Sequence, residues 1–134
     1  MKVIALRGSK DSGKTATMNA LLCLFPAPIQ KLKIDLNKKT RDFWVEFSYN
    51  NKKIGIISIG DPYGEPLTQK SFLIDFREHK CDVIVCVCRT RGKTVDLLID
   101  IFGKSKIVFI RKFQNKNDDI DVAHHIFDII TNTQ

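Results

Sequence analysis

The junction between residues 2–7 and the glycine-rich stretch after them constrains the fold of this chain more than any other feature. KVIALR is a short apolar run bounded by Gly8, which is typical of a buried strand. The stretch GSKDSGKT (residues 8–15) then leads into residues 13–25, where apolar side chains recur at helical spacing until Pro26 ends the helix. A buried strand that turns directly into a helix begins a crossover between parallel strands, so the sequence predicts an α/β fold.

The rest of the chain repeats this alternation of strands and helices. Strands are expected over residues 43–49, 54–59, 82–88 and 106–113, and helices over residues 65–79, 94–102 and 119–131. The last helix is expected to pack through Ile120, Ala123, Phe127 and Ile130. Residues 32–36 indicate a further short strand.

The arrangement of these elements follows from the turn at Asn50 and Asn51. Asparagine tolerates the left-handed conformation, so this pair predicts a tight hairpin between residues 43–49 and 54–59. The remaining connections contain helices and favour parallel strands. We therefore expect a three-layer α/β/α fold with a mostly parallel five-stranded sheet, in which residues 43–49 form an antiparallel edge strand.

Length and composition fit one domain over residues 1–134, because 43% apolar residues are enough to fill a single core. No apolar run approaches the roughly 20 residues of a membrane span, and the start does not resemble a signal peptide. We therefore expect a cytoplasmic protein with no membrane partner. The four cysteines lack the paired spacing of a zinc site and are expected to be buried, reduced thiols, with Cys86 and Cys88 on one strand face.

The spacing of Gly8, Gly13, Lys14 and Thr15 is that of a phosphate-binding loop, and it matches every defined position of that pattern. Glycine lets the backbone curl around an anion, and the N–H groups of residues 11–15 then point inward. The N-terminus of the following helix adds the positive end of its dipole. Lys14 would supply a mobile charge for the β- and γ-phosphates, and the Thr15 hydroxyl a ligand for Mg²⁺. The alternative is a strand-to-helix turn without a ligand.

This motif resembles the Walker A loop of the P-loop NTPase superfamily, and the chain is similar to small members of its kinase–GTPase-like branch. The resemblance implies the P-loop NTPase fold and a nucleoside triphosphate, ATP (or GTP), bound together with Mg²⁺. It also implies a set of nucleotide-binding residues. These are Gly8, Ser9, Lys10, Asp11, Ser12, Gly13, Lys14, Thr15 and Ala16.

A second part of the resemblance is Asp61, which ends IGIISIGD and stands in the Walker B position. It would hold Mg²⁺ opposite Thr15 and act with Lys14 in catalysis. The alternative role is that of a turn aspartate before Pro62. In the kinase–GTPase branch the strand that leads to Asp61 would lie next to the strand that leads to the glycine-rich loop.

Comparison with particular branches gives a mixed result. Pro62 stands where many ATP-driven motors carry a catalytic glutamate. DPYG (residues 61–64) matches the Asp-x-x-Gly of small GTPases, but Glu65 stands where those proteins usually have the glutamine that orients water. NKND (residues 115–118) matches Asn-Lys-x-Asp, in which Asp118 would read guanine. The alternative is a polar loop with a helix cap, and we expect ATP to be favoured over GTP.

The stretch CRTRGKT (residues 88–94) follows a strand expected to be central, so it should lie at the carboxyl edge of the sheet beside the glycine-rich loop. Arg89 and Arg91 are candidate catalytic residues that would stabilise charge during phosphoryl transfer or hold a second anionic substrate. The alternative is a basic loop capped at Thr94. This stretch also resembles one found in small bacterial and phage P-loop proteins.

The sequence thus favours Mg²⁺-dependent binding of a nucleoside triphosphate, with hydrolysis or transfer of the γ-phosphate. A small-molecule or nucleotide kinase is the alternative enzyme. The net charge of +7 also leaves open a nucleotide-switched regulatory or nucleic-acid-associated module, although the chain contains no aromatic-rich stacking motif. The sequence does not specify the phosphoryl acceptor, the partner or the oligomeric state.

Overall fold

A computed structural model describes residues 1–8, 13–26, 30–36, 43–59, 69–90, 92–112 and 118–132, with residues 30–36 described by their backbone. The strands are β1 (Lys2–Arg7), β2 (Gln30–Leu36), β3 (Phe43–Tyr49), β4 (Lys52–Ile57), β5 (Val83–Cys88) and β6 (Ile107–Arg111). The helices are α1 (Lys14–Leu24), α2 (Gln69–Glu78), α3 (Lys93–Phe102) and α4 (Asp119–Thr131), with a short 3-10 helix η1 (Lys104–Lys106). None of the helices in these ranges is both long and apolar enough to cross a membrane.

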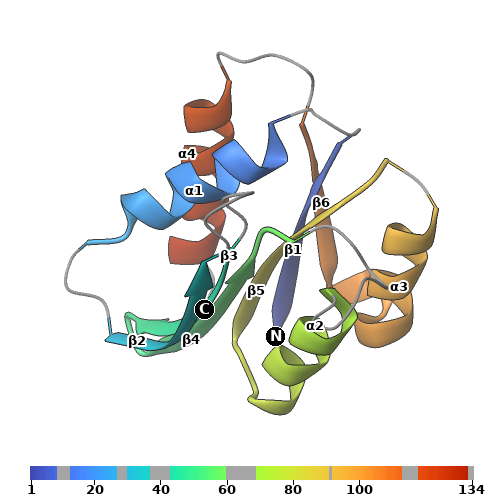
Figure 1. Cartoon of the computed structure of the whole chain (residues 1–134), viewed down its shortest axis with the longest axis horizontal. Coiled ribbons are helices and arrows are strands. Elements are labelled where there is room, and N and C mark those ends of the chain that lie inside the picture. The colour runs from blue at the N-terminus through green and yellow to red at the C-terminus, as the bar shows by residue number, and fades with distance from the viewer. Residues whose placement is uncertain are drawn as a thin grey trace.

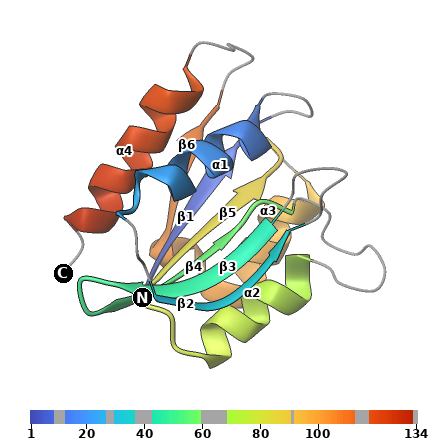
Figure 2. The same cartoon turned by 60° about the vertical axis from the view of Figure 1, so that its left-hand side comes forward.

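Six strands in the described residues form one mixed sheet in the order β2-β3-β4-β5-β1-β6 (Figures 1 and 2). β4, β5, β1 and β6 run parallel to one another, whereas β3 is antiparallel to both β2 and β4. The α/β class and the mostly parallel central strands agree with the sequence prediction. The strand count differs, because β2 is a full strand of the sheet.

The identity of the edge strand also differs from the prediction. The sequence predicts β3 as the edge strand, but β3 is not at the edge of the sheet. β2 pairs along its whole length with the outer side of β3 and takes the edge position itself. In the sequence, residues 30–36 alternate apolar and polar positions, but four of the seven are Gln, Lys or Asp. Such a segment gains strand structure from its partner rather than from burial on both faces, so its signal was weak.

The helices cover both faces of this sheet, which gives three layers (Figure 1). On one face α1 and α4 pack together and cover a core that includes Ile4, Leu6, Met18, Leu21, Val85, Ala123 and Ile126. On the other face α2 and α3 cover a core that includes Val3, Ala5, Phe72, Phe76, Cys86, Leu98 and Phe102. Alternate residues of β1 therefore face opposite layers, and β1 and β5 are the buried centre of the molecule.

Two packing expectations are wrong. Ile120 is 63% exposed, because α4 turns Ala123, Ile126 and Ile130 toward the sheet and leaves its first turn outside that stripe. Cys23 is an exposed free thiol, whereas Cys81, Cys86 and Cys88 are buried as expected. Cys23 lies two residues after the buried Leu21, about 200° around the helix, so it points away from the core.

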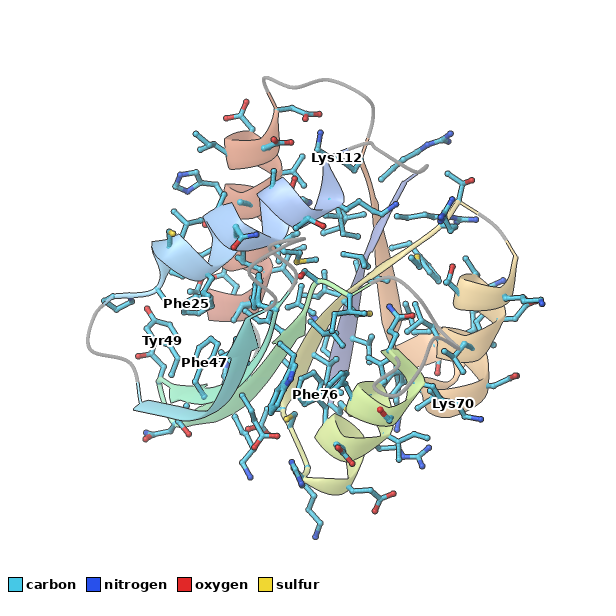
Figure 3. The ribbon with its side chains drawn as sticks, viewed as in Figure 1. Phe25, Phe47, Tyr49, Lys70, Phe76 and Lys112 are labelled. Carbon is cyan, nitrogen blue, oxygen red and sulfur yellow. The ribbon has the colours of Figure 1, made fainter. Side chains whose placement is uncertain are left out.

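Four aromatic rings pack the C-terminal end of α1 against the β3–β4 hairpin and against α4. Phe25, directly after α1, has its ring centroid 4.8 Å from Phe47, 5.2 Å from Tyr49 and 5.1 Å from Phe127, each in an edge-to-face arrangement. Figure 3 shows Phe25, Phe47 and Tyr49 gathered between α1 and the hairpin. At the tip of the hairpin, Asn50 and Asn51 have the positive φ angles that the sequence predicts. These contacts fix the C-terminal end of α1, and its other end faces the candidate site.

A close approach in the other layer gives a first prediction. The ring of Phe76 lies against the backbone of Gly55 in β4, and a Cβ atom at Gly55 would stand 2.7–2.8 Å from three ring atoms. Gly55→Ala is therefore expected to lower the free energy of unfolding by about 1–3 kcal/mol. Urea denaturation measures this change. Phe76→Leu in the Gly55→Ala background should recover part of the loss, and a fully stable Gly55→Ala single variant would contradict the packing.

Candidate functional site

The loops that follow β1, β5 and β6 begin side by side at the carboxyl ends of these parallel strands, which we call the carboxyl edge of the sheet. The N–H of Gly8 donates to the carbonyl of Cys88 at 3.1 Å, and the N–H of Lys112 donates to the carbonyl of Arg7 at 2.6 Å. These bonds extend the parallel pairing one residue beyond the strands. The glycine-rich segment, CRTRGKT and the segment before α4 therefore start from neighbouring points, as the sequence predicts for the first two.

This carboxyl edge contains a topological switch point, where neighbouring strands connect to helices on opposite faces of the sheet. β1 leads into α1 on one face of the sheet, and its neighbour β5 leads into α3 on the opposite face (Figure 1). The two segments therefore diverge where they leave the sheet. In open α/β sheets, ligands bind outside the carboxyl ends of the strands at such a point. The architecture thus points to the same place as the glycine-rich motif.

Lys14 is the first residue of α1, and its side chain folds back over the loop. Its Nζ donates to the carbonyl oxygen of Gly8 at 2.6 Å, so the ammonium group lies against the start of the glycine-rich segment. This contact links the first residue of α1 to Gly8, at the start of the glycine-rich segment. A cation at the N-terminal end of a helix is a suitable environment for an anion.

The N-terminus of α1 has neither a side-chain cap nor an acidic residue in its first turn. Gly13 is its N-cap with φ of 89°. Among the described residues, the Asp119 carboxylate contacts this first turn: it accepts from the Thr17 hydroxyl at 3.3 Å and is also paired with Lys112 at 3.0 Å. Because Lys112 offsets that carboxylate, the positive end of the α1 dipole remains available to an external anion.

Gly13 provides a second prediction, because its backbone is left-handed and its Cα lies against α4. A Cβ atom there would stand 3.0 Å from Asp119 Oδ1. Gly13→Ala should cost about 1–3 kcal/mol of stability from backbone strain and weaken nucleotide binding. Gly103→Ala is the matched control, since Gly103 has φ of 85° but open space around it. Thermal shifts with and without MgATP test both effects, and equal nucleotide responses in the two variants would contradict a role for Gly13.

Lys112 is the centre of a charged cluster that the sequence did not reveal. Lys112, labelled in Figure 3, directly follows β6. Its side chain is fully buried and pairs with both Asp118 and Asp119. Burial acts to lower the pKa of Lys112, but its hydrogen bonds and charge interactions with the two carboxylates outweigh this effect and raise the pKa above its usual value. The cluster joins the N-terminus of α4 to Gly13 and Thr17 of α1. It therefore fixes where α1 begins.

This cluster also bears on the Asn-Lys-x-Asp match. Asp118 is the N-cap residue of α4 but makes no side-chain cap bond, because its carboxylate contacts the Lys112 ammonium instead. Residues 113–117, which include Asn115, lie outside the described residues. Recognition of guanine by Asp118 stays a prediction, and its carboxylate has a structural partner already.

The start of the CRTRGKT stretch is fixed by two contacts. The buried Thr94 hydroxyl accepts a hydrogen bond from the N–H of Arg89 at 2.9 Å. Thr94 is not the helix cap that the basic-loop alternative expects, because Gly92 is the N-cap of α3 and no side chain caps this end. The Arg7 guanidinium donates through Nε at 2.7 Å, and through a second nitrogen, to the carbonyl of Thr90. Arg89 itself is exposed, and Gly92 adopts φ of 100°, which permits the turn into α3. The loop is thus tied to the last residue of β1.

Positive charge gathers around the end of β5. Burial raises the pKa of the Cys88 thiol to about 11, while Arg7 and Lys14 act in the opposite direction. Burial also raises the pKa of Cys86, and burial together with Glu46 raises that of Cys81 to about 12. These three thiols stay protonated at neutral pH and are poor nucleophiles. The chemistry of this edge therefore depends on its cations and backbone amides.

Several predicted site residues lie outside the described residues: Ser9, Lys10, Asp11, Ser12, Asp61 and Arg91. Gly8, Gly13, Lys14, Thr15 and Ala16 are described and form the end of β1 and the start of α1. The strand order corrects the expected neighbour of β1. β5 lies between β1 and β4, the strand that leads toward residue 61, so these two are not adjacent as the kinase–GTPase branch would require.

The described residues are compatible with Mg²⁺ carried by a nucleotide. They contain no group of three His, Cys, Asp or Glu side chains that would hold a metal ion by themselves. Mg²⁺ at phosphate sites needs no such cage, because it takes one or two side chains and completes its shell with phosphate oxygens and water. Thr15, in the first turn of α1, would supply one of those oxygens.

Comparison with known proteins finds no family model that matches the chain, and neither the curated proteins nor the solved structures contain a significant match.

Reasoning from the sequence missed Arg7, Lys112 and Asp119. Arg7 was simply the last residue of an apolar strand, and Lys112 one of many lysines. The only available signal for the cluster was the acidic pair at residues 118–119 shortly after a buried strand. That pair is equally typical of a helix N-terminus exposed to solvent, so its partner was visible only in three dimensions.

Proposed function

We propose that this protein binds a nucleoside triphosphate with Mg²⁺ and hydrolyses it or transfers its γ-phosphate, as a P-loop NTPase of the three-layer α/β/α type. The observation that carries the proposal is the contact of the Lys14 ammonium with the Gly8 carbonyl across the ends of the glycine-rich segment. A cation, a bare helix N-terminus and a matched phosphate-loop sequence coincide at one switch point of the sheet.

Each described residue has a defined role in this proposal. The Lys14 ammonium moves from the Gly8 carbonyl to the β- and γ-phosphates, where it stabilises charge in the ground state and in transfer. Gly13 lets the backbone amides face the phosphates, and the Lys112 cluster holds α1 in place. Thr15 contributes a hydroxyl to Mg²⁺, with Asp61 as the proposed second ligand through water. Arg89 and Arg91 are proposed to assist transfer.

The strand order argues against the kinase–GTPase branch of the superfamily. With β5 between β1 and β4, the chain departs from the kinase–GTPase arrangement, so that part of the resemblance is not proposed here. Preference for ATP over GTP remains a proposal, supported by the ion pair between Lys112 and Asp118, the carboxylate that would recognise guanine. A thermal-shift panel of ATP, GTP and CTP with their diphosphates, with and without Mg²⁺, tests base preference and metal dependence together.

A kinase is the second candidate, and the position of the CRTRGKT stretch favours it. That stretch begins directly beside the end of β1 and carries an exposed arginine toward solvent. A kinase hydrolyses ATP slowly on its own and faster with its acceptor. Stimulation of ADP release by a small phosphorylated or carboxylated compound would therefore favour the kinase over a simple hydrolase.

A further inference from the structure

A pocket of about 310 Å³ lies at the same edge of the sheet, lined by Arg7, Thr90, Phe109 and Arg111. It is formed where β1, β5 and β6 end. Phe109 packs against the core on the α2–α3 side, and it pairs in register with Ala5, as Arg111 pairs with Arg7. The pocket therefore opens on the face opposite α1, across the end of β1 from the glycine-rich segment. Its volume is at the lower end of those that hold small ligands.

Arg7 is held in position inside this pocket before any ligand arrives. Two of its N–H groups donate to the carbonyl of Thr90, and its guanidinium carbon lies 5.2 Å from the centre of the Phe109 ring. A guanidinium has five N–H donors, so three remain, and no other residue in the described ranges accepts from them. A partly buried arginine held on an aromatic ring with donors to spare is preorganised for an oxyanion.

Arg111 adds a second guanidinium at the mouth of the pocket. It occupies the register position opposite Arg7 on β6, and its side chain is exposed. The pocket lining contains two cations, one hydroxyl and no acidic residue among the described residues. Such a lining repels cations and favours an anion. A phosphate or carboxylate group accepts from the remaining donors of Arg7 and lies near the positive charge of Arg111.

From this geometry we propose that the pocket binds the oxyanion, phosphate or carboxylate, of a second small molecule that reacts with or responds to the bound nucleotide. The proposal rests on the function proposed above and names the class of the second ligand. Gly8, whose carbonyl accepts from the Lys14 ammonium, directly follows Arg7, so the two cations lie on the two sides of the same chain end. Two anions can thus bind on either side of the β1 end.

Binding is tested by NMR on the full chain, with inorganic phosphate and acetate as probes and the Arg7 Nε–H signal as the readout. The titration is made in the wild type and in Lys14→Ala, so that phosphate held by the glycine-rich loop is removed from the comparison. Phosphate or acetate should shift the signal equally in both proteins. Arg111→Gln should weaken this binding at least about tenfold, whereas Lys106→Gln, an exposed lysine on η1, should leave it unchanged.

The two probes distinguish the ligand chemistry. A response to phosphate alone assigns a phosphorylated ligand, and a response to acetate alone a carboxylated one. The proposal is overturned if the shift disappears in Lys14→Ala, if Arg111→Gln binds like the wild type, or if neither probe binds. MgATP binding is measured separately on the same proteins, so loss of the pocket and failure of the proposed nucleotide site give different results.

Discussion

Lys14→Ala is expected to abolish nucleotide turnover and to weaken MgATP binding roughly 10- to 150-fold, while the protein remains folded. This loss corresponds to the 1.5–3 kcal/mol of a hydrogen bond to a charged group. The side chain of Lys14 is only partly buried, its ammonium donates to the Gly8 carbonyl, and it belongs to neither hydrophobic core, so its removal leaves the two hydrophobic layers intact. Calorimetry and an ADP-release assay measure the two effects.

Lys104→Ala is the matched control, because Lys104 is an exposed lysine on η1, which follows α3 and precedes β6. It removes the same charge from the molecule and should bind MgATP like the wild type. Lys14→Arg separates charge from geometry, since a guanidinium keeps the charge but is bulkier than an ammonium. Unchanged turnover in Lys14→Ala would remove this residue from the mechanism.

Lys112→Met is expected to be the most destabilising of the charge substitutions, at about 3 kcal/mol. It leaves Asp118 and Asp119 without their cation, and removal of one partner of a buried ion pair typically costs 3–5 kcal/mol. The lower end applies because the two aspartate side chains remain 26% and 23% exposed. Urea denaturation at neutral pH measures the loss, and Lys106→Met, at an exposed lysine, should change stability little.

A combined variant shows whether the cost comes from uncompensated charge. Lys112→Met with Asp118→Asn and Asp119→Asn removes all three charges, and it should recover much of the stability lost in Lys112→Met. If the combined variant is as unstable as the single one, packing rather than charge explains the effect. The combined variant should still bind MgATP more weakly than the wild type, because the contacts that hold Gly13 and Thr17 to α4 are altered.

The parts of the fold that the sequence predicted well are those with a strong local signal. β1, β3 and α4 have the predicted bounds, since a bounded apolar run, an aromatic-rich segment before a tight turn and a helical stripe define them. β2 was underestimated because its alternation is diluted by lysines, and its position depends on pairing with β3. The order of the strands could not be derived locally, because it depends on where each crossover returns to the sheet.

The candidate site also contains residues that the sequence predicted and residues that it did not. Gly13 and Lys14 were predicted because the phosphate loop is contiguous in sequence, and its chemistry depends on spacing along the chain. The Lys112 cluster and the Arg7 pocket join residues from opposite ends of the chain, so no spacing rule reveals them. The predicted adjacency of the strands leading to the loop and to Asp61 came from a family resemblance, and β5 occupies that place instead.

The most direct test of the central claim compares a nucleoside triphosphate with its nucleoside by titration calorimetry on the unmodified protein. Because the phosphates are expected to contact the Lys14 ammonium and the helix N-terminus, MgATP or MgGTP should bind far more tightly than adenosine or guanosine. Equal affinity for the triphosphate and its nucleoside would contradict the claim that this edge of the sheet binds phosphate.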